Sequence, residues 1–122
     1  MGVRRKHQDL LAWQHAIQMV MAIYRLTSEF PDSERFGLGA QMRRAAVSVP
    51  SNIAEGAARL GQKEFLHFLG IARVSLSEID TQLVIDTELG YTTDAAELEQ
   101  SINDFFGRLN GLINSLKCSG IP

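Results

Sequence analysis

One segment of the chain, residues 42–60, carries two side-chain patterns at the same helical spacing. Apolar residues recur at three- and four-residue steps, as on the buried face of a helix: Met42, Ala45, Val49, Ile53 and Leu60. Polar residues recur at the same steps, displaced by roughly a third of a turn at about 100° per residue: Arg44, Ser48, Asn52, Glu55 and Arg59. Because a polar row beside a core costs desolvation unless its members are paired, we expect this row to form either a specific interhelical contact or a site.

Helical periodicity extends through most of the chain and predicts an all-α fold without strands. The expected helices cover approximately these ranges: 9–29, 38–58, 62–89 and 94–117. The buried face of the first helix is expected to be its apolar stripe: Leu10, Trp13, Ile17, Val20 and Tyr24. Short connections favour antiparallel neighbours, which predicts an antiparallel up-down-up-down four-helix bundle.

The helix boundaries rest on local signals. Asp9 is a candidate cap for the first helix, and Gly90 is placed to end the third. Asp94 with Glu97 suggests a capping box for the fourth, and Pro50 predicts a kink in the second. The 122 residues form one expected domain, 1–122, with flexible tails over 1–8 and 118–122.

The third predicted helix has apolar residues on most of its sides. Five of them lie off its core face, and we expect them to form a subunit interface of a homo-oligomer: Leu66, Ile71, Val74, Val84 and Ile85. The alternative is that they are scattered surface hydrophobic residues, which are common.

The net charge of −2 conceals an uneven distribution. Residues 1–75 contain ten Lys/Arg and six Asp/Glu, whereas residues 76–122 contain two and eight. The candidate residues for binding a partner or a nucleic acid are basic: Arg43, Arg44, Arg59, Lys63 and Arg73. The sequence pI is near 5.9, and no aromatic residues are interleaved with the basic ones. Both features are unlike those of a dedicated nucleic-acid-binding protein. In the alternative interpretation, Arg43, Arg44 and Arg59 pair with acids of neighbouring helices or subunits.

We expect the polar row to extend to the third helix as one network: Arg44, Ser48, Asn52, Glu55, Arg73 and Glu78. Catalysis is not expected, because nothing assembles a nucleophile, a base and an orienting group. Glu64 and His67 have the spacing of half a di-iron site, but no second Glu-x-x-His occurs. We therefore predict no enzyme, metal, cofactor or small-molecule substrate.

No apolar run approaches the roughly 18 residues of a membrane span, so no membrane association is expected. Cys118 is the only cysteine, which excludes a disulfide within the chain and favours a reducing cytoplasm. The sequence assigns Cys118 no role.

The run from Gln41 to Gly56, with Ser-Val-Pro-Ser-Asn-Ile-Ala-Glu-Gly at its end, resembles a known family. Further matching positions follow in the third predicted helix: Phe65, Phe68, Leu69, Ala72, Arg73, Ser75, Leu76 and Glu78. The family comprises the bacterial four-helix-bundle proteins encoded in intervening sequences of 23S rRNA genes, which are similar to the accessory variability protein of diversity-generating retroelements. The resemblance implies an antiparallel bundle that assembles into a homopentameric ring without known catalytic activity. Gly39-Ala40 and Gly61 depart from the usual capping residues.

Two hypotheses follow from these patterns. In the first, the chain is a ring-forming adaptor whose basic residues bind RNA or an RNA-associated protein. In the second, the polar network only fixes helix register and subunit geometry, as buried polar groups do in some proteins.

Overall fold

The computed structural model describes residue 7 and residues 10–119, and in this part of the chain it contains four α-helices and no strand. The long elements are α1 (Leu11–Thr27), α2 (Leu38–Ala58), α3 (Gln62–Glu88) and α4 (Ala96–Ser119). A short 3₁₀ segment, η2 (Asp32–Glu34), lies between α1 and α2. Most of the two predicted tails, and the candidate cap Asp9, lie outside the described residues.

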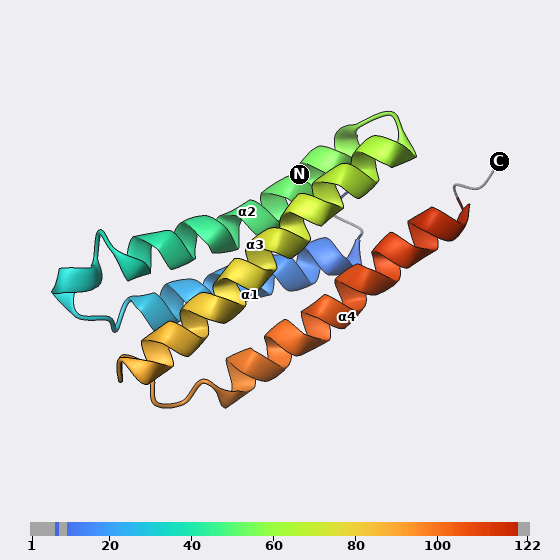
Figure 1. Cartoon of the computed structure of the whole chain (residues 1–122). Coiled ribbons are helices and arrows are strands. Elements are labelled where there is room, and N and C mark those ends of the chain that lie inside the picture. The colour runs from blue at the N-terminus through green and yellow to red at the C-terminus, as the bar shows by residue number, and fades with distance from the viewer. Residues whose placement is uncertain (1–6, 8–9, 120–122) are drawn as a thin grey trace, which may run out of the picture.

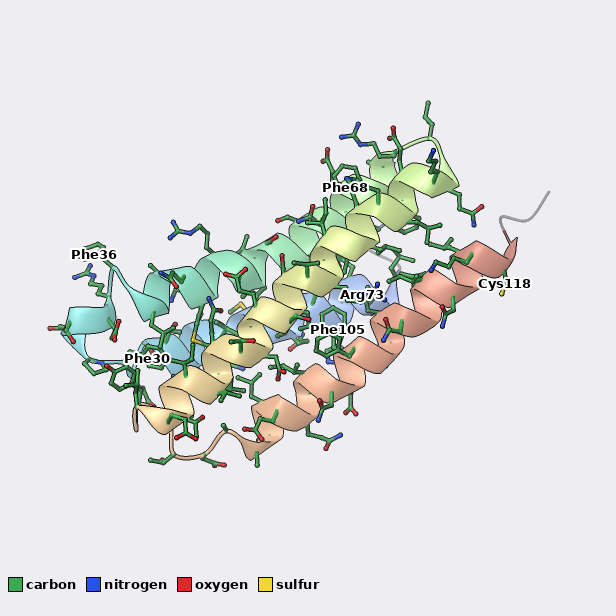
Figure 2. All side chains as sticks on the ribbon, in the orientation of Figure 1. Phe30, Phe36, Phe68, Arg73, Phe105 and Cys118 are labelled. Atoms are coloured by element: carbon green, nitrogen blue, oxygen red, sulfur yellow. The ribbon has the colours of Figure 1, made fainter. Side chains whose placement is uncertain are left out.

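Each long helix packs against two others: α2 against α1 and α3, and α4 against α3 and α1 (Figure 1). At the junction of α3 and α4, Gln62 Nε2 donates a hydrogen bond of 2.6 Å to the carbonyl of Leu116. Gln62 begins α3 and Leu116 lies near the end of α4. The four helices enclose a core of mainly aliphatic side chains, with Phe105 of α4 fully buried within it (Figure 2).

The helix α1 is rotated relative to the sequence-based prediction. Its fully enclosed side chains are small or unbranched for the most part: Ala12, Ala16, Met19 and Ile23. The stripe from Leu10 to Tyr24 that was expected to face the core is only half-buried, and Tyr24 is exposed. The helix α1 has two apolar rows, and packing against α2 and α4 encloses the row that contains its alanines. The prediction was also wrong for Leu60, which is fully exposed in the connection after α2.

The helices α2 and α3 lie close together at Gly56. A Cβ atom on Gly56 would lie 2.8 Å from Cβ of Phe68 and 2.9 Å from Cδ1 of Phe65. Only a residue without a side chain fits there, so Gly56 sets the spacing between the two helices at this end of the bundle.

The predicted stop at Gly90 is confirmed. Gly90 has φ of +80°, its N–H donates to the carbonyl of Thr87, and the N–H of Tyr91 donates to the carbonyl of Asp86. These two bonds form a Schellman motif that ends α3. Helix α4 begins at Ala96, two residues after the predicted cap Asp94.

The Tyr91 side chain ties this turn to the opposite connection. Its hydroxyl donates a 2.9 Å hydrogen bond to Oε2 of Glu34, whose Oε1 accepts the backbone N–H of Leu38 at 3.1 Å. Glu34 therefore caps the start of α2 and links the two connections at this end of the bundle.

Candidate partner-binding surface

A line of polar side chains, called here the α2–α3 seam, follows the outer edge of the contact between these two helices. At its centre, the Ser48 hydroxyl lies 2.9 Å from the Ser75 hydroxyl across the helix pair. Asn52, one turn after Ser48, donates from Nδ2 to the Ser48 carbonyl at 2.8 Å and to the Ser48 hydroxyl at 3.0 Å. Three polar side chains beside the core thus satisfy one another, which removes much of the cost of burying them.

Towards the start of α2, Arg44 and Glu78 continue the seam. They lie on either side of a hollow of about 310 Å³ that Gln41, Ser48 and Ser75 also line. Arg44 is exposed, and its side chain has no hydrogen-bond or ion-pair partner among the described residues. Its charge is therefore available to a ligand in this part of the seam.

At the other end of the seam, Arg59 is held by three neighbours. Its Nη2 lies 2.7 Å from Oε1 of Glu55, its Nε lies 3.9 Å from Oε2 of Glu64, and its guanidinium stacks 5.0 Å from the centre of the Phe68 ring. The ion pairs are about half exposed, so they hold the geometry without contributing much stability.

Beside Arg59 the surface is hollowed. Lys63 and His67 line this depression of about 480 Å³ together with Arg59, Glu64 and Phe68. Lys63 is exposed, and within the described residues its side chain makes no hydrogen bond or ion pair. The seam therefore carries three cations (Arg44, Arg59 and Lys63) along with three carboxylates: Glu55, Glu64 and Glu78.

Arg43 does not join the seam, although it precedes Arg44 directly. Its Nε donates a 2.7 Å hydrogen bond to the Thr27 hydroxyl, and its Nη2 donates to the Tyr24 carbonyl at 3.2 Å. The guanidinium also lies 4.4 Å from the centre of the Tyr24 ring. Arg43 thus fastens α2 to the end of α1.

Arg73 is likewise directed away from the seam. Its Nη1 donates a 3.0 Å hydrogen bond to Oδ1 of Asn110, so it bridges α3 and α4 (Figure 2). Of the predicted network, the structure brings together Arg44, Ser48, Asn52 and Glu78, and it places Glu55 with Arg59 further along. The predicted network did not include Ser75, although this residue lies one turn before Glu78 on the same side of α3.

The five residues predicted as a subunit interface differ in exposure. Val74, Val84 and Ile85 are exposed, with Val74 retaining 69% of its accessible surface. Ile71 is half-buried, and Leu66 is half-buried against the core. Three of the five residues therefore lie free on the outer surface of α3.

The described residues contain no group of three or more His, Cys, Asp or Glu side chains arranged to hold a metal ion. Within the same part of the chain, no helix is both long enough and apolar enough to span a membrane. Cys118 is exposed near the end of α4 (Figure 2).

Comparison with known proteins relates the chain to one family. Residues 8–111 match the profile of the family described as 23S rRNA-intervening sequence protein. The match includes all of α1, α2 and α3, with every residue of the seam, and the first two thirds of α4. No curated protein gives a significant match to the chain.

Proposed function

Because the chain belongs to the family of 23S rRNA-intervening sequence proteins, we propose that it is a non-catalytic helical adaptor for RNA, or failing that for an RNA-associated protein. The working form is a ring of copies, five by the family resemblance, each an antiparallel up-down-up-down bundle in the cytoplasm. The contacts of Gln62 with Leu116 and of Arg43 with Thr27 support this topology, since each joins the beginning of one helix to the end of another.

The observation that carries the proposal is the unpaired state of Arg44 and Lys63. Among the five predicted basic residues, Arg43, Arg59 and Arg73 already have partners, whereas Arg44 and Lys63 have none within the described residues. Two free cations in each copy contribute little affinity alone. A ring repeats them, and phosphate contacts on one RNA then accumulate across the subunits.

The test is a titration of the purified protein with an RNA hairpin from 23S rRNA at two salt concentrations. The double variant Arg44→Ala/Lys63→Ala should weaken binding and flatten the dependence on salt, because fewer counterions are released. The matched control removes two exposed cations from α4, Arg108→Ala/Lys117→Ala, and should leave binding within about twofold of the wild type. Equal losses in both variants would indicate unspecific charge attraction. No RNA binding by the wild-type ring would turn the search to a protein partner.

A second function is favoured by the hydrogen bonds among Ser48, Asn52 and Ser75. In this alternative, the seam sets the register of α2 on α3 and binds nothing. Asn52→Leu should then change the mass of the assembly in light scattering, whereas Arg44→Ala/Lys63→Ala should alter neither mass nor any binding property. A loss of RNA binding at constant mass would contradict this alternative.

A further inference from the structure

We propose that the copies join through two different faces, with an apolar, acid-free face of α1 and α2 packing on the apolar, acidic outer row of α3 in the next copy. This inference rests on the ring assembly of the proposed function and names the surfaces that build it.

The first face follows from the rotation of α1. Ala12, Ala16, Met19 and Ile23 occupy the inward positions of α1, so the second apolar row of this helix is left half-buried or exposed. Together with one valine of α2 this row forms what is called here the α1–α2 face: Trp13, Ile17, Val20, Met21, Tyr24 and Val47. Met21 keeps 51% of its surface exposed and Val47 keeps 42%. A second apolar row with this much exposed surface is unusual for a helix that meets only water on that side.

The second face is the α3 row: Val74, Val84, Ile85 and Leu89. All four side chains are exposed. Val74 and Ile85 are separated by eleven residues, which is close to three helical turns, so they point in the same direction along the outer edge of α3. The helix α3, which carries this row, lies on the near side of the molecule in Figure 1, whereas α1 lies at the back.

The charges around the two faces are complementary. Residues 10–28 contain no Asp or Glu, and neither does α2 before Glu55, whereas Arg25 is exposed there and the Arg43 guanidinium lies over the Tyr24 ring. From Val74 to the end of α3 there is no Lys or Arg, and three acids are exposed: Glu78, Asp80 and Glu88. Opposite charges flanking two apolar patches favour their contact and disfavour the contact of either patch with itself.

Two different patches on one chain produce a particular kind of assembly. A contact between unlike patches leaves one free patch at each end of a growing chain, so it continues until a ring closes or a filament forms. A symmetric dimer would instead need one patch that fits itself. Neither face does so, because contact of a face with itself would bring like charges together. The two faces therefore account for a ring without any further surface.

The test blocks each face separately with exposed positions that the fold tolerates. Met21→Glu/Val47→Glu blocks the α1–α2 face, and Val74→Glu/Ile85→Glu blocks the α3 row. The matched control Leu60→Glu/Phe36→Glu places the same charges on two exposed apolar residues outside both faces. Circular dichroism checks that each variant remains helical, and light scattering gives its mass.

We expect each blocked variant to be a monomer and the control to have the wild-type mass. Mixed at equal concentration, the two blocked variants should form a 1:1 dimer and nothing larger. Each retains one intact face, and the two blocked faces repel each other through their added glutamates.

Wild-type mass in either blocked variant, or no dimer in the mixture, would overturn the inference while leaving the ring and its RNA binding in place. A monomeric wild-type chain would overturn the inference and the ring together. Loss of RNA binding in Arg44→Ala/Lys63→Ala concerns the seam alone, so the two proposals fail by different readouts.

Discussion

The hydroxyl groups of Ser48 and Ser75 lie 2.9 Å apart at the contact of α2 with α3, 27 residues apart in the sequence. Ser75 is buried and Ser48 is half-buried. Such a contact between two short side chains requires close helices, and Gly56 two turns further along α2 supplies that closeness. The seam and the packing of the two helices therefore depend on each other.

Removing either hydroxyl should destabilise the fold. Ser75→Ala is expected to lower the free energy of unfolding by about 1 kcal/mol, because a hydrogen bond is lost and the Ser48 side chain loses one partner. Urea denaturation measures this change. Ser77→Ala, on the exposed side of α3, is the control and should change stability by less than about 0.5 kcal/mol. In a double-mutant cycle, additive effects of Ser48→Ala and Ser75→Ala would show that the two hydroxyls do not interact.

Gly56→Ala should destabilise the protein by about 1–3 kcal/mol, because overpacking forces neighbouring groups to move. The new Cβ would meet Cβ of Phe68 at 2.8 Å and the backbone oxygen of Phe65 at 3.3 Å, and neither atom is the flexible end of a side chain. Thermal unfolding of the variant measures the loss.

The matched control for Gly56 is Gly107→Ala in α4, where nothing lies within 4 Å of the added Cβ. That variant should gain about 0.5–1 kcal/mol, because alanine loses less backbone entropy than glycine in a helix. If both glycine variants shifted stability in the same direction, the close approach at Gly56 would not control the packing.

The helices themselves could be predicted from the sequence, because apolar spacing and the stop at Gly90 report local conformation. The orientation of α1 could not. Its two apolar rows are both compatible with a core, and burying Ala12 and Ala16 depends on how closely the neighbouring helices approach. The choice between the rows is therefore made by tertiary packing, which one helical segment does not encode alone.

Only part of the candidate site could be predicted from the sequence, and the reason differs from the one that applies to α1. Adjacent residues on a helix point about 100° apart, so Arg43 reaches α1 while Arg44 stays on the seam. The same geometry separates Arg73 from Glu78, which are five residues apart. Grouping basic residues by their nearness in sequence overlooked this angle. The bond to Asn110 depends on the packing of α4 and had no signal in the sequence.

Asp86 should make stability depend on pH. Its side chain is fully buried, and burial raises the pKa of its carboxyl, although nearby hydroxyls of Thr92 and Thr87 lower it in part. As the pH rises past the ordinary carboxyl pKa of 3.8, Asp86 ionises in the unfolded chain before it ionises in the folded protein. The contribution of Asp86 to stability therefore falls between pH 3.8 and the raised pKa. Above the raised pKa this cost is fully present.

Asp86→Asn should therefore raise the free energy of unfolding at pH 7, and its advantage over the wild type should shrink as the pH falls towards the ordinary carboxyl value. Urea unfolding of both proteins across pH 4 to 8 measures the difference between their free energies of unfolding. Taking this difference cancels the titration of the groups that the two proteins share. Asp80→Asn, at an exposed position on α3, is the control for removing one negative charge from the same helix. If the difference for Asp86→Asn were constant over this range, burial would not raise the pKa of the Asp86 carboxyl.

The neighbouring arginines 43 and 44 should respond in opposite ways to the same substitution. Arg43→Ala removes a 2.7 Å hydrogen bond to Thr27, a second to the Tyr24 carbonyl and the stacking on the Tyr24 ring, so it should lower stability by about 1–2 kcal/mol. Arg44→Ala removes an exposed side chain without a partner among the described residues and should change stability by less than about 0.5 kcal/mol.

RNA binding should show the reverse order at a temperature where both variants are folded. Arg44→Ala should weaken it, because a phosphate contact is lost in every copy of the ring, whereas Arg43→Ala should bind as the wild type does. Chemical denaturation and an RNA titration on the same two preparations give both quantities. Arg43→Ala could instead reduce RNA binding as strongly as Arg44→Ala without altering the assembly. The assignment of Arg43 to helix packing and of Arg44 to partner binding would then be wrong, because the Arg43 guanidinium would contact the partner as well as α1.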